Sequence, residues 1–243
     1  AASQKKEMNL MELFGVILGD GCLVYQAGRK AKVSFLEITG NADDEVDYYE
    51  KIKIFIEEFT GRRARLVIKY YHNGKALRLI QNNKAFLEFL MQEFDIHPPK
   101  TFNAHIPEKY HNWAQSKDII RGIFESDGSL FFSRMHPSRP PIYPRLEIKT
   151  SSIVLMNQLL KILQQQGFDV HATPPQNGKT YRIYVSGYAM LEKWVNEIGF
   201  SSLKNQTKYL FWKKHQYYVP RLTLAARLQD LNEVKLENRP LAP

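Results

Sequence analysis

The chain has few of the features that mark secreted or membrane proteins. Cys22 is the single cysteine among 243 residues, so no disulfide can form within the chain, and this favours a reducing compartment. No apolar run approaches the roughly 18–20 residues that a membrane-spanning helix requires, and the first residues show no secretory signal pattern. We therefore expect an intracellular protein that makes no membrane contact.

Acidic residues are scarce relative to basic ones. The chain has 25 Asp and Glu against 34 Lys and Arg, which gives a formal net charge of +9 and a pI near 9.4. A basic excess of this size favours an anionic partner, most often nucleic acid. The apolar content of 44% is sufficient for a real core, and the length allows one large domain or two ordinary ones.

A nine-residue phrase occurs twice in the chain. Residues 13–21 read LFGVILGDG and residues 120–128 read IRGIFESDG. Each copy predicts a short apolar helix that is closed by Asp-Gly. An internal repeat of this kind indicates a doubled architecture.

Small residues stand at the third and seventh places of each copy, as Gly15 and Gly19 and as Gly122 and Ser126. Residues four apart share a helix face, and small ones let two helix backbones approach closely. If the two helices pack together, Asp20 and Asp127 emerge at the same end. A divalent cation with a preference for hard oxygen ligands, such as Mg²⁺, relieves the repulsion between two such carboxylates.

The segments around the phrases also repeat in order. Strands are expected at 33–39, 65–71, 76–81, 144–149 and around 181–183, and helices at 43–59, 83–94, 153–166 and 188–198. Asn73-Gly74 and Asn177-Gly178 each predict a hairpin turn, and residues 135–143 predict a loop between two strands. The expected domains are a first half (1–100), a linker (101–116), a second half (117–220) and a tail (221–243) with a short helix near 223–231.

The predicted fold is therefore α+β, with two pseudo-symmetric αββαββα halves that each contain a four-stranded antiparallel sheet. Helices cover one face of such a sheet and leave the other open. Two open faces side by side form a concave saddle that, with its positive charge, suits double-stranded DNA.

Strand alternation indicates which side chains lie on the open faces, because every second residue points to the same side. Arg, Lys and Glu on such a face can read base edges in the major groove. The predicted base contacts are Glu37, Thr39, Arg65, Lys69, Tyr71, Arg78, Arg145, Glu147, Lys149, Arg182, Tyr184 and Ser186. Lys208, Lys213 and Lys214 are predicted phosphate contacts, which position the protein without specifying sequence.

The doubled phrase and the order of elements resemble the LAGLIDADG homing endonucleases in their single-chain, two-motif form, over about residues 10–215. The resemblance implies a monomer that cuts both DNA strands across the minor groove and leaves 3′ overhangs. It also implies two or three divalent ions, taken as Mg²⁺, at the motif-helix interface. Asp20 and Asp127 are the implied metal ligands, with the backbone carbonyls of Gly19 and Ser126 as helpers.

The resemblance also implies a basic residue near the metals, and Lys100 and Lys204 fit this place in the two halves. Each is expected to polarise the scissile phosphate or stabilise developing charge. Family members often carry Gln or a similar residue just after the Leu-Glu-Ile-like strand, where it positions water. This chain has Gly40-Asn41 in one half and Lys149-Thr150 in the other, so water positioning has no assigned residue.

The two halves also differ at the sixth place of the motif, where Leu18 corresponds to Glu125. We therefore expect two unequal cleavage sites and a long target that is not palindromic. Other functions remain open: a non-cleaving binder on the same scaffold, such as an RNA-splicing maturase or a DNA-binding regulator, an endonuclease domain from an intein, or a plain structural domain. The intact pair of Asp residues favours cleavage.

Overall fold

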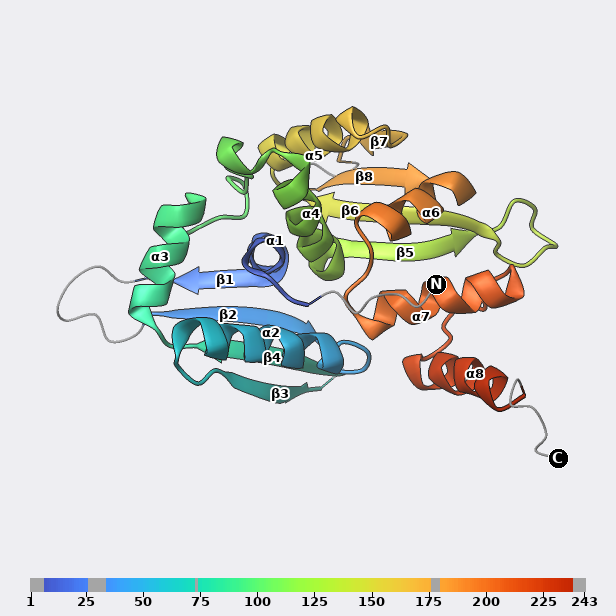
Figure 1. The fold of residues 1–243 in the computed structure, drawn as a ribbon, viewed down its shortest axis with the longest axis horizontal. Helices are drawn as coiled ribbons and strands as arrows, with labels where there is room; N and C mark the ends of the chain where they lie inside the picture. The colour runs from blue at the N-terminus through green and yellow to red at the C-terminus, as the bar shows by residue number, and fades with distance from the viewer. Residues whose placement is uncertain (1–6, 26–33, 73, 176–179, 238–243) are drawn as a thin grey trace.

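Two four-stranded antiparallel sheets lie on either side of a central pair of helices (Figure 1). The computed structural model describes residues 7–25, 34–72, 74–175 and 180–237. The first half contains α1 (Leu10–Asp20), β1 (Gly21–Val24), β2 (Phe35–Asn41), α2 (Val46–Thr60), β3 (Arg65–Tyr71), β4 (Gly74–Gln81) and α3 (Lys84–Phe94). The second contains α4 (Trp113–Asp127), β5 (Gly128–Ser133), β6 (Tyr143–Thr150), α5 (Ile153–Gln165), β7 (Val170–Thr173), β8 (Tyr181–Ser186) and α6 (Tyr188–Glu197).

The αββαββα order predicted for each half is confirmed. Helix ends also lie where residues of the sequence indicated them. Gly61 ends α2 in the left-handed conformation, with φ of 62°, and the side chain of Asn83 caps α3. The first hairpin differs by one residue, because Gly74 pairs with Tyr71 as part of β4. Gly74 thus belongs to the strand, and Asn73 and the predicted turn at Asn177-Gly178 lie outside the described residues.

Each sheet buries one face and leaves the other open. The strand orders are β1-β2-β4-β3 and β5-β6-β8-β7. Helices α2 and α3 contact the first sheet, and α5 and α6 contact the second. Alternate strand residues point to this side and form the core, with Leu36, Ile38, Leu77 and Leu79 in the first sheet and Leu146, Ile148, Ile183 and Val185 in the second. The intervening residues therefore form the two open faces.

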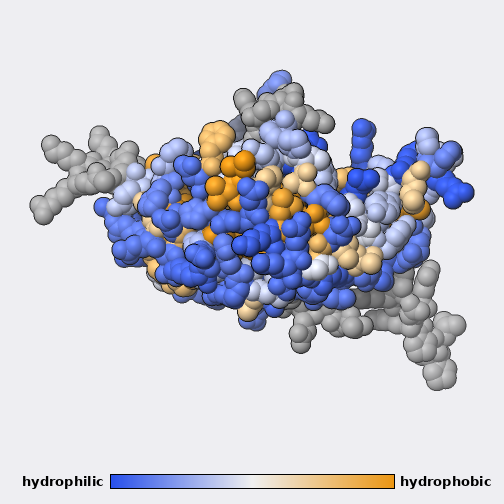
Figure 2. Space-filling view, turned by 90° about the horizontal axis from the view of Figure 1, so that it is seen from above, coloured by the Kyte–Doolittle hydropathy of each residue, from blue (hydrophilic) through white to orange (hydrophobic). Residues whose placement is uncertain are grey.

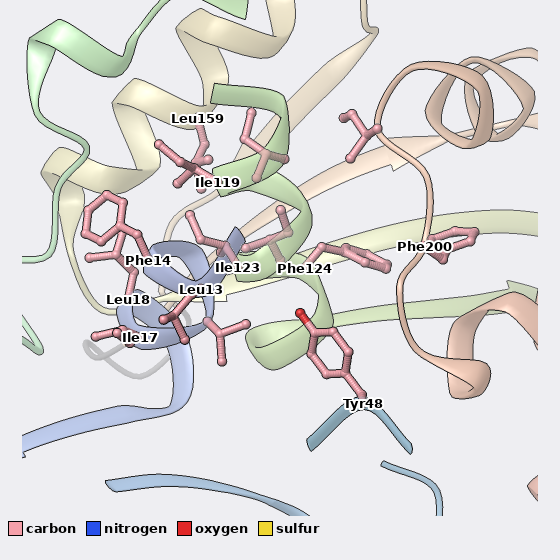
Figure 3. Close-up of a cluster of buried hydrophobic side chains, with 14 of the residues drawn as sticks. Leu13, Phe14, Ile17, Leu18, Tyr48, Ile119, Ile123, Phe124, Leu159 and Phe200 are labelled. Atoms are coloured by element: carbon pink, nitrogen blue, oxygen red, sulfur yellow. The ribbon is translucent and has the colours of Figure 1, made fainter. Parts of the chain in front are cut away.

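The two motif helices, α1 and α4, pack against each other at the centre of the molecule (Figure 3). A Cβ added at Gly15 would overlap the carbonyl oxygen of Ile119 and lie 2.9 Å from the Gly122 Cα, and one at Gly122 would lie 2.8 Å from the Val16 nitrogen. Only glycine permits this backbone approach. The predicted role of the small motif residues is confirmed at these two positions.

A buried polar network crosses the same helix pair. The Arg121 guanidinium on α4 and the Glu12 carboxylate on α1 are 2.9 Å apart, with exposed side-chain fractions of 1% and 0%. Arg121 also donates to Asp118 at 2.7 Å, and the Tyr48 hydroxyl donates to Glu12 at 3.0 Å. Figure 3 shows Tyr48 with its hydroxyl directed toward the motif helices. Each charge is compensated, so the network joins the two halves across the interface.

Further helices follow or connect the two halves. A 3₁₀ helix (Glu108–Tyr110) lies in the linker. The helix α7 (Leu203–His215) had not been predicted, although Ser202 caps its start and basic residues occupy its last turn. The tail helix α8 (Leu224–Glu237) is longer than the segment predicted near 223–231. It is anchored by Arg227, which is 2% exposed and donates to the Thr207 hydroxyl on α7 at 2.9 Å.

The surface seen from above is largely hydrophilic, with apolar residues gathered near the middle of this face (Figure 2). Within the described residues, none of the helices combines the length and the apolar character needed to cross a membrane.

Candidate active site and nucleic-acid interface

Packing of α1 on α4 brings Asp20 and Asp127 together at the ends of the two helices. A Cβ added at Gly19 would lie 2.8 Å from the Ser126 Cβ and 3.3 Å from Oδ2 of Asp127. Burial raises the pKa of Asp20 to about 7, and the charges of Asp127 and Glu45 contribute to the rise. Burial also raises the pKa of Asp127, against the opposing effect of Lys100 and Lys149. Two carboxylates are thus held close together in a place where their charges are costly.

The donor set at this place fits a divalent cation of the Mg²⁺ type. Two partly buried carboxylates that repel each other are hard oxygen ligands in need of a compensating positive charge. No cluster of three or more His, Cys, Asp or Glu side chains suited to a metal lies within the described residues. Any further ligands at this site would therefore be main-chain oxygens, water or a phosphate.

Lys100 lies directly beside the first motif. Its ammonium group donates to the carbonyl oxygens of Leu18 at 2.7 Å and Gly19 at 2.8 Å. Burial lowers its pKa, while Asp127 and Asp20 act in the opposite direction. The Gly19 carbonyl, a predicted metal helper, thus already accepts a hydrogen bond from Lys100, and the ammonium lies close to both motif carboxylates.

Lys204 has a different environment, because a carboxylate of the other half holds it. Its ammonium pairs with Glu45, the residue at the N-cap position of α2 in the first half. Burial alone would lower the pKa of Lys204, but Glu45 and Glu125 raise it above its ordinary value. The two predicted catalytic lysines are therefore unequal, since Lys204 has a paired acid and Lys100 is held by main-chain oxygens.

Glu125, the sixth residue of the second motif, anchors the helix that carries Lys204. Its carboxylate is 2% exposed and accepts hydrogen bonds from the Ser201 nitrogen at 2.6 Å, the Ser202 hydroxyl at 2.5 Å and the Asn205 amide at 2.8 Å. These groups surround the start of α7, where a carboxylate is favoured by the helix dipole. Leu18, the matching residue of the first motif, has an aliphatic side chain that cannot accept hydrogen bonds, and no helix follows Lys100 directly.

Ser126 does not direct its side chain toward a ligand site. Its hydroxyl donates to the carbonyl oxygens of Gly122 at 2.9 Å and Ile123 at 3.1 Å within α4. Its predicted contribution to metal binding was a backbone carbonyl, and that stays a prediction.

The predicted base contacts of the first half share the open face of their sheet. Pairing places Thr39 beside Arg78 and Arg78 beside Val67. These residues alternate with the buried Leu77 and Leu79. The face carries the six predicted residues Glu37, Thr39, Arg65, Lys69, Tyr71 and Arg78. The second half repeats the arrangement with Arg145, Glu147, Lys149, Arg182, Tyr184 and Ser186.

A glutamate at the centre of each open face is ion-paired. Arg78 donates to Glu37 at 2.7 Å, and in the second half Lys149 and Arg182 lie 3.1 and 3.6 Å from Glu147. The hydrogen bond from Arg78 lowers the pKa of Glu37, burial opposes this, and the positive charge of Arg78 lowers the pKa further. Glu147 is only 6% exposed. Lys149 and Arg182 therefore compete with DNA bases for the Glu147 carboxylate.

The three lysines predicted to contact phosphates lie on α7 rather than on the strands. Lys213 pairs with Glu192 of α6 at 2.5 Å and Lys214 with Asp230 of α8 at 2.9 Å. Lys208 donates to the Leu130 carbonyl at 3.4 Å, and burial lowers its pKa to about 8, with help from Lys204 and Arg227. Their proposed contacts would thus compete with existing protein partners.

Two residues near the carboxylates were missed in the sequence. Glu45 lies in the acidic cluster before α2, which was read as a favourable helix start. Tyr49 follows in the first turn of α2. Neither residue belongs to a sequence motif that would have marked it as part of the site. Only the structure links Tyr49 to Gly40, where an added side chain would overlap the tyrosine ring.

A sequence model described as the LAGLIDADG DNA endonuclease family matches residues 11–192. This range includes both motif phrases and both sheets. A comparison with curated protein sequences finds no match.

Solved structures share the fold at low sequence identity. I-SmaMI bound to uncleavable DNA matches with a TM-score of 0.58 and 12% identity over 95% of this chain and 97% of its own. I-DmoI in complex with DNA and Mn matches with 0.53 and 15%, over 78% and 94%. I-WcaI bound to its DNA recognition sequence matches with 0.53 and 18%, over 77% and 79%.

Proposed function

Since the chain belongs to the LAGLIDADG DNA endonuclease family, we propose that it is a site-specific homing endonuclease. It would bind a long, asymmetric double-stranded DNA target as a monomer. It would cut both strands in a reaction that depends on divalent metal and leaves 3′ overhangs. The observation that carries this proposal is the pairing of Asp20 and Asp127 at the ends of two motif helices in backbone contact.

The residues present suit metal-assisted hydrolysis of a phosphodiester. Asp20 and Asp127 would hold the divalent ions, which supply an activated water and charge stabilisation for the attacking and leaving oxygens. Lys100 lies beside both carboxylates and would donate to an oxygen of the scissile phosphate. The twelve strand residues on the open faces would contact the bases of the target.

The solved structures of similar proteins support this proposal. I-DmoI has been crystallised with DNA and Mn and with DNA and Ca, and I-WcaI with its recognition sequence. The positive net charge of this chain, +9, and the open strand faces provide a surface for the same kind of ligand. The second candidate, a non-cleaving maturase or regulator on the same scaffold, is not favoured by any residue of the site, because both carboxylates are intact.

The first test is cleavage by variants of the two carboxylates. The target is found first by exposing the protein to a randomised DNA library in Mg²⁺ and sequencing the cut ends. Asp20→Asn and Asp127→Asn are each expected to lower double-strand cleavage at least about a thousandfold, because each removes a charge that holds metal. DNA affinity in Ca²⁺ should stay within about threefold of the wild type. The control Asp43→Asn changes an exposed acid whose partner is Lys75.

Normal cleavage by either carboxylate variant would contradict the shared site. Binding of a specific DNA or RNA by the wild-type protein, without cleavage in Mg²⁺, would favour the non-cleaving candidate.

A further inference from the structure

One buried hydroxyl beside the carboxylate pair has no role in the fold. Tyr49 is 2% exposed, and its phenol oxygen has no hydrogen-bond partner among the described residues. Buried polar groups in folded proteins nearly always have a partner, and an unpaired one lowers stability. Phenylalanine could stand at this place at no cost to the fold, because the hydroxyl makes no bond there. The location of the hydroxyl therefore bears on function.

The strand register places this hydroxyl at the end of the first motif helix. β1 begins with Gly21 opposite Ile38, so the residues after Ile38 run past the end of α1 that carries Asp20. A Cβ added at Gly40 would overlap the Tyr49 ring and its hydroxyl. The phenol therefore fills the space that a side chain of Gly40 would occupy, which is the place without an assigned water-positioning residue.

The charges around the phenol show what kind of hydrogen bond it can make. Burial raises the pKa of Tyr49 far above its ordinary value of 10, and the charges of Asp20, Glu45 and Asp127 raise it further. The phenol consequently keeps its proton near neutral pH. It can donate one hydrogen bond and accept another, but it cannot act as a base.

The second half lacks this group. By the same register Thr150 takes the place of Gly40, and its hydroxyl accepts from the Ser152 nitrogen at 3.1 Å. Met156 takes the place of Tyr49, because both are the fourth residue of their helix. The two halves therefore differ at this point among the described residues: the Tyr49 hydroxyl makes no hydrogen bond, whereas the Thr150 oxygen already accepts one.

We propose that the Tyr49 hydroxyl is the water-positioning group of the first-half active site, where it donates a hydrogen bond to a water beside Asp20. This inference rests on the endonuclease function proposed above. The phenol gives up no proton and forms no bond to the substrate. It orients the water that the two carboxylates and their metal ions activate, and it does so for only one of the two strand cuts.

The first test needs neither metal nor DNA. Tyr49→Phe removes only the unpaired oxygen, so the urea midpoint should equal or exceed that of the wild type. The matched control is Tyr48→Phe, a neighbouring and equally buried tyrosine whose hydroxyl donates to Glu12. That variant should have a lower midpoint. Destabilisation of Tyr49→Phe to the same degree as Tyr48→Phe would mean that the hydroxyl has a partner within the fold, and would overturn the proposal.

The second test follows the two strands separately in single-turnover cleavage of the library-derived target. Tyr49→Phe should slow one strand about tenfold, as expected for the loss of one hydrogen bond, so a nicked intermediate accumulates. DNA affinity in Ca²⁺ and the rate on the other strand should be unchanged. Unchanged rates on both strands, or equal slowing of both, would overturn the proposal. A wild-type protein that does not cleave at all would refute the endonuclease function instead, while the unfolding comparison would still decide whether the hydroxyl is free.

Discussion

At the scale of single residues, the site is costly to fold. Burial raises the pKa of both Asp20 and Asp127, and the charge of Asp127 adds to the rise at Asp20. Tyr49 adds a buried hydroxyl without a partner. Active sites typically contain groups that lower the stability of the fold but are needed for the reaction. These unfavourable groups gather at the end of α1, whereas Glu12 and Arg121, buried farther along the motif helices, are paired with each other.

The cost of Asp20 should depend on pH. Its pKa is about 7 in the fold against 3.8 ordinarily, so between these values the folded protein binds a proton that the unfolded chain does not. The stability from this group is complete below about pH 4 and is lost as the pH rises through 7. In EDTA, Asp20→Asn should therefore raise the free energy of unfolding at pH 8, by on the order of 2 kcal/mol after screening of this partly exposed group.

Urea unfolding of the wild type, Asp20→Asn and Asp43→Asn at pH 5 and pH 8 measures this effect. Asp43→Asn should change little at either pH, since its carboxylate is exposed. The gain from Asp20→Asn should be clearly larger at pH 8. A gain of the same size at both pH values would show that Asp20 titrates normally.

At the scale of elements, the two motif helices can pack closely because their glycines have no side chains at the contact. Replacement of a helical glycine by alanine ordinarily gains up to about 1 kcal/mol. At Gly15 the new methyl would instead overlap the Ile119 carbonyl oxygen, and a backbone atom cannot turn aside. Gly15→Ala should therefore destabilise the protein by several kcal/mol, roughly 3 or more.

Gly19 offers a contrast within the same helix. A Cβ there would meet the side chain of Ser126, which can be removed by mutation. Gly19→Ala should be destabilising by itself, and Ser126→Gly should restore most of the loss in the double variant. Thermal unfolding of the single and double variants checks this expectation. Failure of the second substitution to rescue the first would mean that backbone contacts, and not Ser126, limit the approach near Gly19.

Local sequence signals accounted for most of the elements. Gly61 and Asn83 ended and began helices where their chemistry requires, because such caps act within one turn. The helix α7 was missed because its apolar pattern is weak, and because its start is held by Glu125, a residue 77 positions before Ser202. Ser202 is a local cap, but the carboxylate that holds it lies too far away in the chain to leave a mark in the local sequence.

At the scale of the whole molecule, the two halves are joined by a buried ion pair with unlike partners. Glu12 belongs to α1 and Arg121 to α4. By the alignment of the two motif phrases, Ile119 corresponds to Glu12, and Phe14 corresponds to Arg121. The pair therefore exists only between a first half and a second half, which fits a single chain with one copy of each.

Loss of one partner should be much worse than loss of both. Arg121→Met alone leaves the buried Glu12 carboxylate without its ion pair and should cost about 3–5 kcal/mol. Glu12→Leu alone should cost less, because Arg121 keeps Asp118 as a partner. The double variant should recover much of this loss, because neither charge then remains in the interface. Urea unfolding of the two single variants and the double variant gives the coupling free energy. Additive effects of the two substitutions would indicate that the charges do not compensate each other.

The sequence by itself determined the doubled architecture, the order of elements and the pair of aspartates. These follow from periodicity, turn residues and a repeated phrase, which are local properties. Tertiary structure alone decided that Glu45 of one half holds Lys204 of the other, that Glu125 binds the groups at the start of α7, and that Tyr49 fills the space beside Gly40. The physical reason is that burial, charge pairing and an unsatisfied hydroxyl depend on which distant segments come into contact, and packing sets that contact in three dimensions.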